Sequence, residues 1–263
     1  MLRNRLVLSL MMRNDLFVNS RQFELNPVGN METILQYLHF DAIDELVFLN
    51  VTRESPSVDA FANHLRNLGR HCFVPIAAGG AVRTIDDCQK LLKAGADKIV
   101  INTAVVEDPA FVEQAAHHFG SQCLVYSMDV KKPRRSDEQQ VYTRFGTENT
   151  GLTPVEMAIR AENLGIGEIF LTSIDRDGTC QGYDIALVSD VVKAVGVPVI
   201  ASGGVGEFKH MVEGIRDGGA NAVSAANLFH FIGHSLRKAK TYVRENGLNF
   251  PDPLWNFQSD HKL

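Results

Sequence analysis

The chain has 263 residues, of which 45% are hydrophobic and 22% are charged, a balance typical of a folded domain with a sizeable core. Its formal net charge of −5 argues against a nucleic-acid-binding protein, which needs a basic face, and no apolar run reaches membrane-spanning length. The cysteines (Cys72, Cys88, Cys123 and Cys180) are scattered without the spacing of a metal site or a disulfide framework, so we expect a cytoplasmic protein.

Taken in chain order, strand-length apolar runs alternate with stretches of helical character. The run 5–12 is the first predicted strand, and a polar stretch follows it to Gly29 before Asn30 caps a helix. The long connection 130–152 is expected to hold a small hairpin around 142–145. Further strands are expected at 45–51, 72–78, 98–102, 122–129, 168–174, 198–202 and 222–226, and helices at 31–40, 57–68, 84–95, from Pro109, at 153–165, at 184–195, up to Gly218, and at 233–245.

Eight strands alternating with eight helices predict an α/β fold with a parallel sheet, and the chain length favours closure into a (β/α)8 TIM barrel. We expect a single barrel over residues 1–247 and an irregular tail over 248–263. The run 168–174 is followed by Asp175 and Asp177, carboxylates in a turn at the carboxyl end of a strand. Active sites of these barrels lie at that end, so the two carboxylates mark the candidate mouth.

The two halves of the chain repeat each other. Pro75-Ile-Ala-Ala-Gly-Gly80 matches Pro198-Val-Ile-Ala-Ser-Gly-Gly204, and Ala94-Gly-Ala-Asp97 matches Gly218-Gly-Ala-Asn221, with offsets of 203 − 79 = 124 and 220 − 96 = 124. The barrel is therefore predicted to consist of two similar half-barrels. In each half a Gly-Gly turn precedes a helix whose free N–H groups can bind a phosphate. Two such turns across one mouth predict a long ligand with a phosphate at each end; the alternative is that the glycines only make tight turns.

Several segments form a specific pattern by their length and order: Phe48-Leu-Asn-Val-Thr52, Ala78-Gly-Gly80, Ala96-Asp-Lys-Ile-Val-Ile-Asn-Thr103, Leu171-Thr-Ser-Ile-Asp-Arg-Asp-Gly-Thr179, Ile200-Ala-Ser-Gly-Gly204 and Leu228-Phe-His-Phe231. Through them the chain resembles, from Met1 to about Gly247, the cyclase subunit of imidazole-glycerol-phosphate synthase. The resemblance implies a heterodimer in which a glutaminase subunit docks on the bottom of the barrel and ammonia passes through its interior. The implied reaction, of the carbon–nitrogen lyase class and with neither cofactor nor metal, joins ammonia to a bisphosphorylated ribulosyl aminoimidazole. Its products are imidazole glycerol phosphate, for histidine synthesis, and an aminoimidazole carboxamide ribotide.

The family closes the bottom of its barrel with an ammonia gate of two positive and two negative side chains, which can neutralise one another near the axis. Each counterpart in this chain begins a predicted strand, and side-chain alternation gives Arg5 the same face as Val7 and Ser9. Asp97 matches an aspartate through which the family contacts the glutaminase. The resemblance assigns the gate itself to Arg5, Glu45, Lys98 and Glu168.

At the mouth, the resemblance assigns a catalytic role to Asp129, because the family pairs two aspartates there as general acid and base. The partner position is Met11, whose thioether cannot transfer a proton. A phosphate-binding lysine of the family is replaced by Asn19, and an aspartate by Asn50. The substrate- and phosphate-binding positions that the resemblance assigns are Gly80, Asn102, Thr103, Thr172, Asp177, Gly178, Gly203, Gly204, Ala226 and Asn227, the last in place of a serine.

Three functions fit these residues. The first is an ammonia-using synthase subunit whose phosphorylated acceptor differs from the histidine-pathway intermediate, which the retained Asp129 and the changed Met11 favour. The second is the ordinary cyclase–lyase, in which Asp177 or a water replaces the lost acid. The third is a non-catalytic partner that activates the glutaminase and conducts ammonia to a sugar amidotransferase of surface-polysaccharide synthesis. Replacing Asp129 by Asn separates the first two from the third, because a pure conduit does not use that carboxylate.

Overall fold

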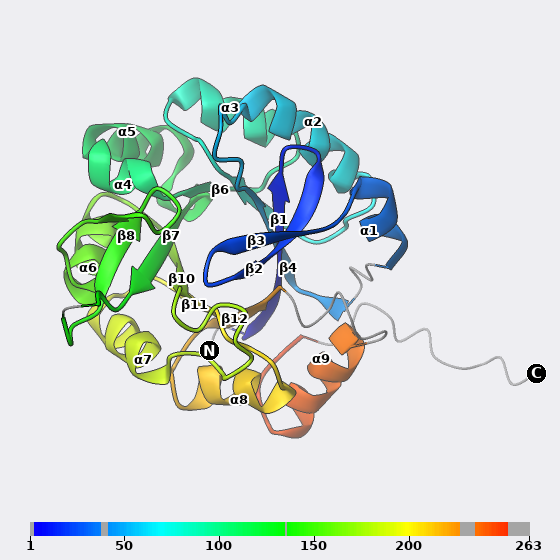
Figure 1. Cartoon of the computed structure of the whole chain (residues 1–263), viewed down its shortest axis with the longest axis vertical. Coiled ribbons are helices and arrows are strands. Elements are labelled where there is room, and N and C mark those ends of the chain that lie inside the picture. The colour runs from blue at the N-terminus through cyan, green and yellow to red at the C-terminus, as the bar shows by residue number, and fades with distance from the viewer. Residues whose placement is uncertain (1–2, 38–41, 135, 227–234, 252–263) are drawn as a thin grey trace, which may run out of the picture.

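The computed structural model describes residues 3–37, 42–134, 136–226 and 235–251. Parallel strands form a closed ring in the order β1, β4, β5, β6, β7, β10, β11 and β12, and β12 pairs with β1 to complete it (Figure 1). The predicted (β/α)8 TIM barrel is therefore confirmed. The strands of the ring are β1 (Arg5–Arg13), β4 (Glu45–Asn50), β5 (Ile76–Gly79), β6 (Lys98–Ile101), β7 (Leu124–Lys131), β10 (Glu168–Ser173), β11 (Val199–Ser202) and β12 (Ala222–Ala225).

Helices surround the ring, and several begin where the sequence predicts a cap. Thr84 Oγ1 accepts a hydrogen bond from Asp87 N at 3.1 Å and begins α3. Asn30 Oδ1 accepts one from Thr33 N at 2.9 Å and begins α1. The helices are α1 (Met31–Tyr37), α2 (Val58–Gly69), α3 (Ile85–Lys93), α4 (Thr103–Glu107), α5 (Pro109–Phe119), α6 (Pro154–Asn163), α7 (Ile185–Ala194), α8 (Phe208–Arg216) and α9 (Ser235–Glu245).

Both faces of the ring strands are buried, which explains their continuous apolar runs. Leu6 and Leu8 of β1 face the helices and belong to the main core, whereas Val7 between them belongs to a second cluster inside the barrel. We call this second cluster the inner apolar layer. Its members are Val7, Val47, Ala77, Val100, Val125, Phe170, Ile200 and Ala222.

The stretch before Gly29, for which the sequence analysis predicted no strand, forms a β-hairpin of β2 (Leu16–Arg21) and β3 (Glu24–Gly29). β2 continues from β1 and pairs with it in antiparallel register, with Met11 opposite Val18. Figure 1 shows the hairpin lying across the centre of the ring, so we call it the cover hairpin. Its chain reverses through Gln22 and Phe23, which both have positive φ angles.

Other boundaries differ from the prediction in smaller ways. β5 begins at Ile76 rather than at residue 72, because Pro75 has no N–H group to donate to a strand ladder. The short helix α4 was not predicted, whereas the hairpin expected in the long connection is confirmed as β8 (Gln140–Thr143) and β9 (Glu148–Asn149). The predicted helix end near Phe40 and the tail beyond Pro251 lie outside the described residues. None of the helices in the described part of the chain is long and apolar enough to cross a membrane.

Candidate functional site

Four charged side chains at the amino ends of ring strands form a closed cycle, which we call the charge ring. Arg5 forms ion pairs with both Glu45 and Glu168 through separate guanidinium nitrogens. Lys98 Nζ lies 2.8 Å from Glu45 Oε1 and 2.7 Å from Glu168 Oε2. Each carboxylate therefore bridges both cations, and the residues predicted for this position are brought together.

The charge ring is largely removed from solvent. The side chains of Glu45 and Glu168 are 3% and 6% exposed, whereas those of Arg5 and Lys98 are 24% and 23% exposed. Burial alone lowers the pKa of Lys98 and of Arg5, but the ion pairs with Glu45 and Glu168 outweigh it and raise both pKa values. The two cations therefore stay charged, and together with the two glutamate side chains they close the bottom of the barrel.

Above the charge ring the barrel interior changes character twice. The inner apolar layer comes next along the strands, one alternation step above the charges. The next inward-facing positions include the buried polar residues Ser9 of β1, Ser127 of β7 and Thr172 of β10, whereas on β4 this position is Leu49, which packs against the inner apolar layer. A small molecule on the axis would therefore meet charged, then apolar, then hydroxyl-bearing side chains on its way to the mouth.

Asp129 lies at the top of this polar layer, on β7 and opposite Thr172 of β10. Asn102 Nδ2 donates to Asp129 Oδ2 at 2.8 Å and to the Ser127 carbonyl at 2.7 Å, which fixes the amide between the two strands. Burial raises the pKa of Asp129 to about 7; the Asn102 hydrogen bond lowers it, and the nearby charge of Asp177 raises it further. At neutral pH the carboxyl group is thus present in both protonation states, which suits it to proton transfer.

The cover hairpin forms hydrogen bonds to Asp177. Ser20 Oγ donates to Asp177 Oδ2 at 2.5 Å, and Phe23 N donates to the same oxygen at 3.3 Å. The Asp177 carbonyl in turn accepts a hydrogen bond from Gln22 N at 3.0 Å. Burial raises the pKa of Asp177, and these hydrogen bonds lower it by less. The carboxylate that the sequence marks as a substrate contact therefore fastens the cover hairpin over the mouth.

The neighbours of Asp177 have structural tasks as well. Gly178 has a φ of +68°, and a Cβ atom there would lie 2.5 Å from the Ser20 carbonyl oxygen, so only glycine allows the cover hairpin to approach so closely. Asp175 Oδ2 accepts a hydrogen bond from Lys132 N at 2.8 Å and ties its turn to the end of β7. Ser20 was not predicted as a functional residue, because nothing in the sequence indicated that its segment folds back over the mouth.

The two duplicated glycine turns have positive φ angles that favour glycine. Gly80 has a φ of +116° and approaches the Asn50 carbonyl, and Gly203 has a φ of +88° and approaches the Ser173 carbonyl. This close packing explains the glycines as turns. The N–H groups of 80–82 and 203–205 also lack acceptors among the described residues, so a phosphate could bind either turn.

Thr103 lies at the start of α4, where its hydroxyl donates to Asn102 Oδ1 at 3.2 Å and accepts from Arg144 N at 3.3 Å. Among the changed positions, Asn50 is buried and its Oδ1 accepts a hydrogen bond from Thr52 N at 3.1 Å. Asn19 Oδ1 is buried without a partner in the described part of the chain. Ala226 follows β12, and Asn227 lies outside the described residues, as do residues 228–231.

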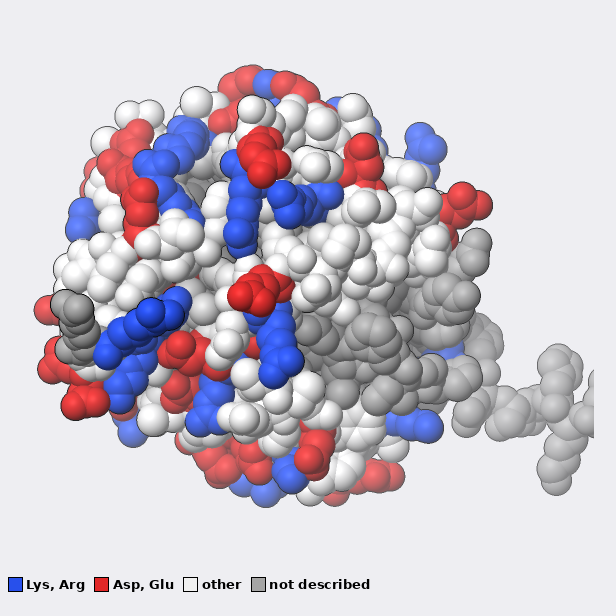
Figure 2. All heavy atoms as spheres, in the orientation of Figure 1, with Lys and Arg blue, Asp and Glu red and all other residues white. Residues whose placement is uncertain are grey.

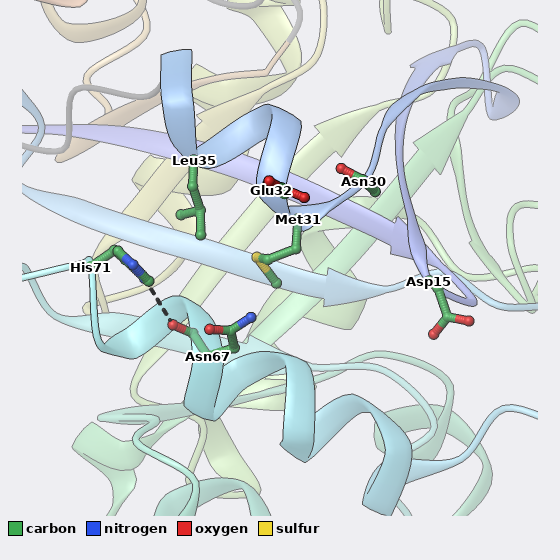
Figure 3. Close-up of a pocket in the computed structure, with 7 residues that line it drawn as sticks. All are labelled: Asp15, Asn30, Met31, Glu32, Leu35, Asn67 and His71. Atoms are coloured by element: carbon green, nitrogen blue, oxygen red, sulfur yellow. Dashed lines mark hydrogen bonds between the residues drawn. The ribbon is translucent and has the colours of Figure 1, made fainter.

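Two open grooves lie away from the mouth. One, of about 640 Å³, runs between α1 and α2, as Figure 3 shows, and none of the sequence-predicted site residues lines it. The other, of about 610 Å³, lies at the bottom of the barrel beside β5 and the end of α2. Its lining includes Phe73, which is 86% exposed, and Asp97, whose Oδ2 accepts a hydrogen bond from Ile76 N at 2.8 Å.

Asp97 thus has a structural role besides the predicted partner contact, and its repeat-mate Asn221 has the same role. Asn221 Oδ1 accepts a hydrogen bond from Val199 N at 3.0 Å, in the way that Asp97 ties Ile76. Each of these hydrogen bonds lies within one half-barrel: the first joins the residue before β6 to β5, and the second joins the residue before β12 to β11.

In the comparison with known protein families, residues 17–234 match the family described as histidine biosynthesis protein.

Proposed function

The chain belongs to the histidine biosynthesis protein family, and from this premise we propose that it is a cyclase-type synthase subunit that adds ammonia to a phosphorylated acceptor. One observation carries the proposal. The charge ring and Asp129 lie on inward faces at opposite ends of one barrel, with the inner apolar layer between them. Such an interior suits a small neutral molecule that enters past the charges and meets a carboxyl group able to move a proton.

The chemistry of the mouth follows from Asp129. Ammonia that attacks an electrophilic carbon becomes positively charged and must lose a proton, and a carboxylate with a pKa of about 7 can accept it at neutral pH. The same group, once protonated, can return the proton to a leaving oxygen. Asn102 holds the carboxylate in place through the 2.8 Å hydrogen bond and leaves the other oxygen, Oδ1, for this exchange.

We propose that the acceptor differs from the ordinary histidine-pathway substrate. At the mouth, Met11 provides no second acid, and Asp177 is bound by Ser20 of the cover hairpin. Both observations also favour a second candidate, a conduit that passes ammonia to a sugar amidotransferase. The candidates differ in their use of Asp129, which a conduit does not need.

The decisive experiment supplies the pure chain with ammonium salt at alkaline pH and the bisphosphorylated aminoimidazole, and follows absorbance. Ammonium removes the need for a glutaminase, so the assay reports the mouth alone. We expect turnover more than about tenfold below that of an ordinary cyclase, because a missing general acid typically costs 10²–10⁴-fold. Turnover within about tenfold of that of an ordinary cyclase would overturn the proposal that the acceptor is altered. A true acceptor, once found, should lose its reaction in Asp129→Asn, and an unchanged rate would favour the conduit.

For the partner, we propose a glutaminase seated on the bottom of the barrel. The groove beside Asp97 lies on the same end as Lys98 of the charge ring, and the exposed Phe73 ring offers an apolar anchor within it. Phe73→Ser should weaken the complex at least about tenfold, the scale of a buried aromatic anchor. Ile159→Ser is the matched control, since Ile159 is also exposed, at 41%, but lies on α6. If calorimetry gives both variants the same affinity for the glutaminase, Phe73 is not part of the interface.

A further inference from the structure

Arg53 is a cation at the mouth without a carboxylate partner in the described part of the chain. Its neighbours on the rim are paired: Arg144 Nη2 lies 2.6 Å from Glu107 Oε1, and Arg83 Nη1 lies 3.2 Å from Glu107 Oε2. Figure 2 shows the same mixture of acidic and basic side chains across this face. An arginine left without a counter-ion among such pairs is available for an anionic ligand.

Two contacts hold Arg53 in place. Its Nη2 donates to the Phe23 carbonyl of the cover hairpin at 2.7 Å. Its guanidinium carbon lies 5.7 Å from the centre of the Phe145 ring, in the loop between β8 and β9. The side chain is therefore fixed between two hairpins that both lie at the mouth, while most of its N–H donors have no acceptor among the described residues.

Residues next to Arg53 and next to its partner Phe145 make contacts with Thr103 and with the first glycine turn. Arg144, next to Phe145, donates its N–H to Thr103 Oγ1 at 3.3 Å. On the other side, the Asn50 carbonyl, three positions before Arg53, is the atom against which Gly80 packs. Arg53 therefore lies on the loop that begins beside the Gly80 turn, and the N–H groups of 80–82 in that turn have no acceptor among the described residues.

We infer that Arg53 is the cationic ligand for a phosphate group of the substrate bound at the Gly80 turn, in place of the lysine whose position Asn19 occupies. The inference rests on the proposed function, because it concerns the phosphorylated ligand of the same mouth. A guanidinium can donate two parallel hydrogen bonds to one phosphate while its face stays on Phe145. Closure of the cover hairpin and binding of the phosphate are then coupled, because Arg53 contacts both.

Three variants separate the effect of the Arg53 charge from the effect of its hydrogen bond to the Phe23 carbonyl. Arg53→Gln keeps a donor for the Phe23 carbonyl but removes the charge, Arg53→Lys keeps the charge, and Arg13→Gln is the matched control, because Arg13 is paired with Glu54 at 3.4 Å. The probes are imidazole glycerol phosphate and the aminoimidazole carboxamide ribotide, each with one phosphate. Their affinities are measured by calorimetry at low ionic strength.

We expect Arg53→Gln to weaken one of the two probes about tenfold or more, as for a lost charge-assisted contact, and to spare the other, which occupies the Gly203 turn. Arg53→Lys should recover part of the loss, and Arg13→Gln should match the wild type. Equal affinities for wild type and Arg53→Gln, or equal losses for both probes, would overturn the inference while leaving the proposed function intact. Wild-type protein that binds neither probe would also overturn the inference, and it would leave the altered acceptor of the proposed function intact.

Discussion

Asp129 is a carboxyl group in surroundings that oppose its charge. Its side chain is buried, and its pKa is raised from the ordinary 3.8 to about 7. Between these two values the folded chain holds a proton that the unfolded chain has released, so the stability of the fold decreases as the pH rises through this window. The residue thus lowers stability at neutral and alkaline pH, a conflict that is expected if Asp129 has the proton-transfer role that we propose.

Replacing this carboxyl group should therefore stabilise the protein. Asp129→Asn keeps an oxygen that can accept the Asn102 hydrogen bond and has no charge to bury. We expect its free energy of unfolding to exceed that of the wild type at pH 8 by roughly 2–4 kcal/mol, from the size of the pKa shift, and by far less at pH 4. Urea denaturation at both pH values measures the difference. A gain that does not grow with pH would show that Asp129 titrates normally in the folded state.

Met11 leads to a prediction of gained activity. It faces the barrel interior on β1, near the end that the cover hairpin crosses. Met11→Asp should raise turnover of the bisphosphorylated aminoimidazole with ammonium at least tenfold, part of the 10²–10⁴-fold range of a general acid. Met11→Asn introduces a similar polar group without a titratable proton and should leave the rate unchanged. If both variants match the wild type, the loss of activity lies elsewhere in the mouth.

At the scale of elements, the cover hairpin connects the beginning of the chain to the turn after β10. Asp177 accepts from both Ser20 and Phe23, and Gly178 allows the close approach. Because this hairpin lies across the centre of the ring, we expect its attachment to affect how a substrate reaches Asp129. The turn at Asp177 and the cover hairpin therefore act as one unit, although they are far apart in the sequence.

Ser20→Ala should loosen this unit. A hydrogen bond to a charged group contributes about 1.5–3 kcal/mol, so the amides of Gln22 and Phe23 should exchange with solvent at least about tenfold faster. Hydrogen exchange followed by mass spectrometry over residues 16–29 measures the effect. Asn26→Ser, on the exposed side of β3, should leave the rates as they are. Unchanged exchange in Ser20→Ala would mean that the hairpin is held by β1 pairing instead.

The sequence predicted the barrel because the ring strands are largely apolar runs bounded by polar residues, as in β10, which begins with Glu168 and ends with Thr172 and Ser173. It failed at the cover hairpin for a local reason. The chain reverses at Gln22 and Phe23 with φ angles of 52° and 66°, which the usual turn residues Gly and Asn do not mark there. These angles are maintained by tertiary contacts, such as the bond between Phe23 N and Asp177, which no local pattern reveals.

In the candidate site, too, the features set by local sequence could be predicted, and those set by long-range contacts could not. Alternation within a strand is local, so the inward direction of Arg5 and Lys98 could be predicted, and their contacts with Glu168 followed. The attachment of Asp177 to Ser20 joins residues 157 positions apart through an element that was not predicted. Arg53 was not predicted as a site residue for the same reason, because its contact with Phe23 depends on that hairpin.

At the scale of the whole molecule, the barrel has the charge ring at one end and the buried Asp129 carboxyl group at the other. The charge ring closes the bottom only because its four charges balance, with each carboxylate between two cations. A passage for a neutral molecule there requires that the cycle open without leaving a buried charge alone. The energy of opening is therefore set by the coupling among these side chains.

A double-mutant cycle measures that coupling. Lys98→Met leaves Glu45 and Glu168 to share Arg5, and removing one partner of a buried pair typically costs roughly 3–5 kcal/mol. We expect less here, because the Lys98 side chain is 23% exposed. Adding Glu168→Gln restores neutrality, so the double variant should unfold at higher urea than Lys98→Met alone. Strictly additive losses would mean that the four charges act independently, and the bottom of the barrel would then be a set of separate surface ion pairs rather than a closed ring.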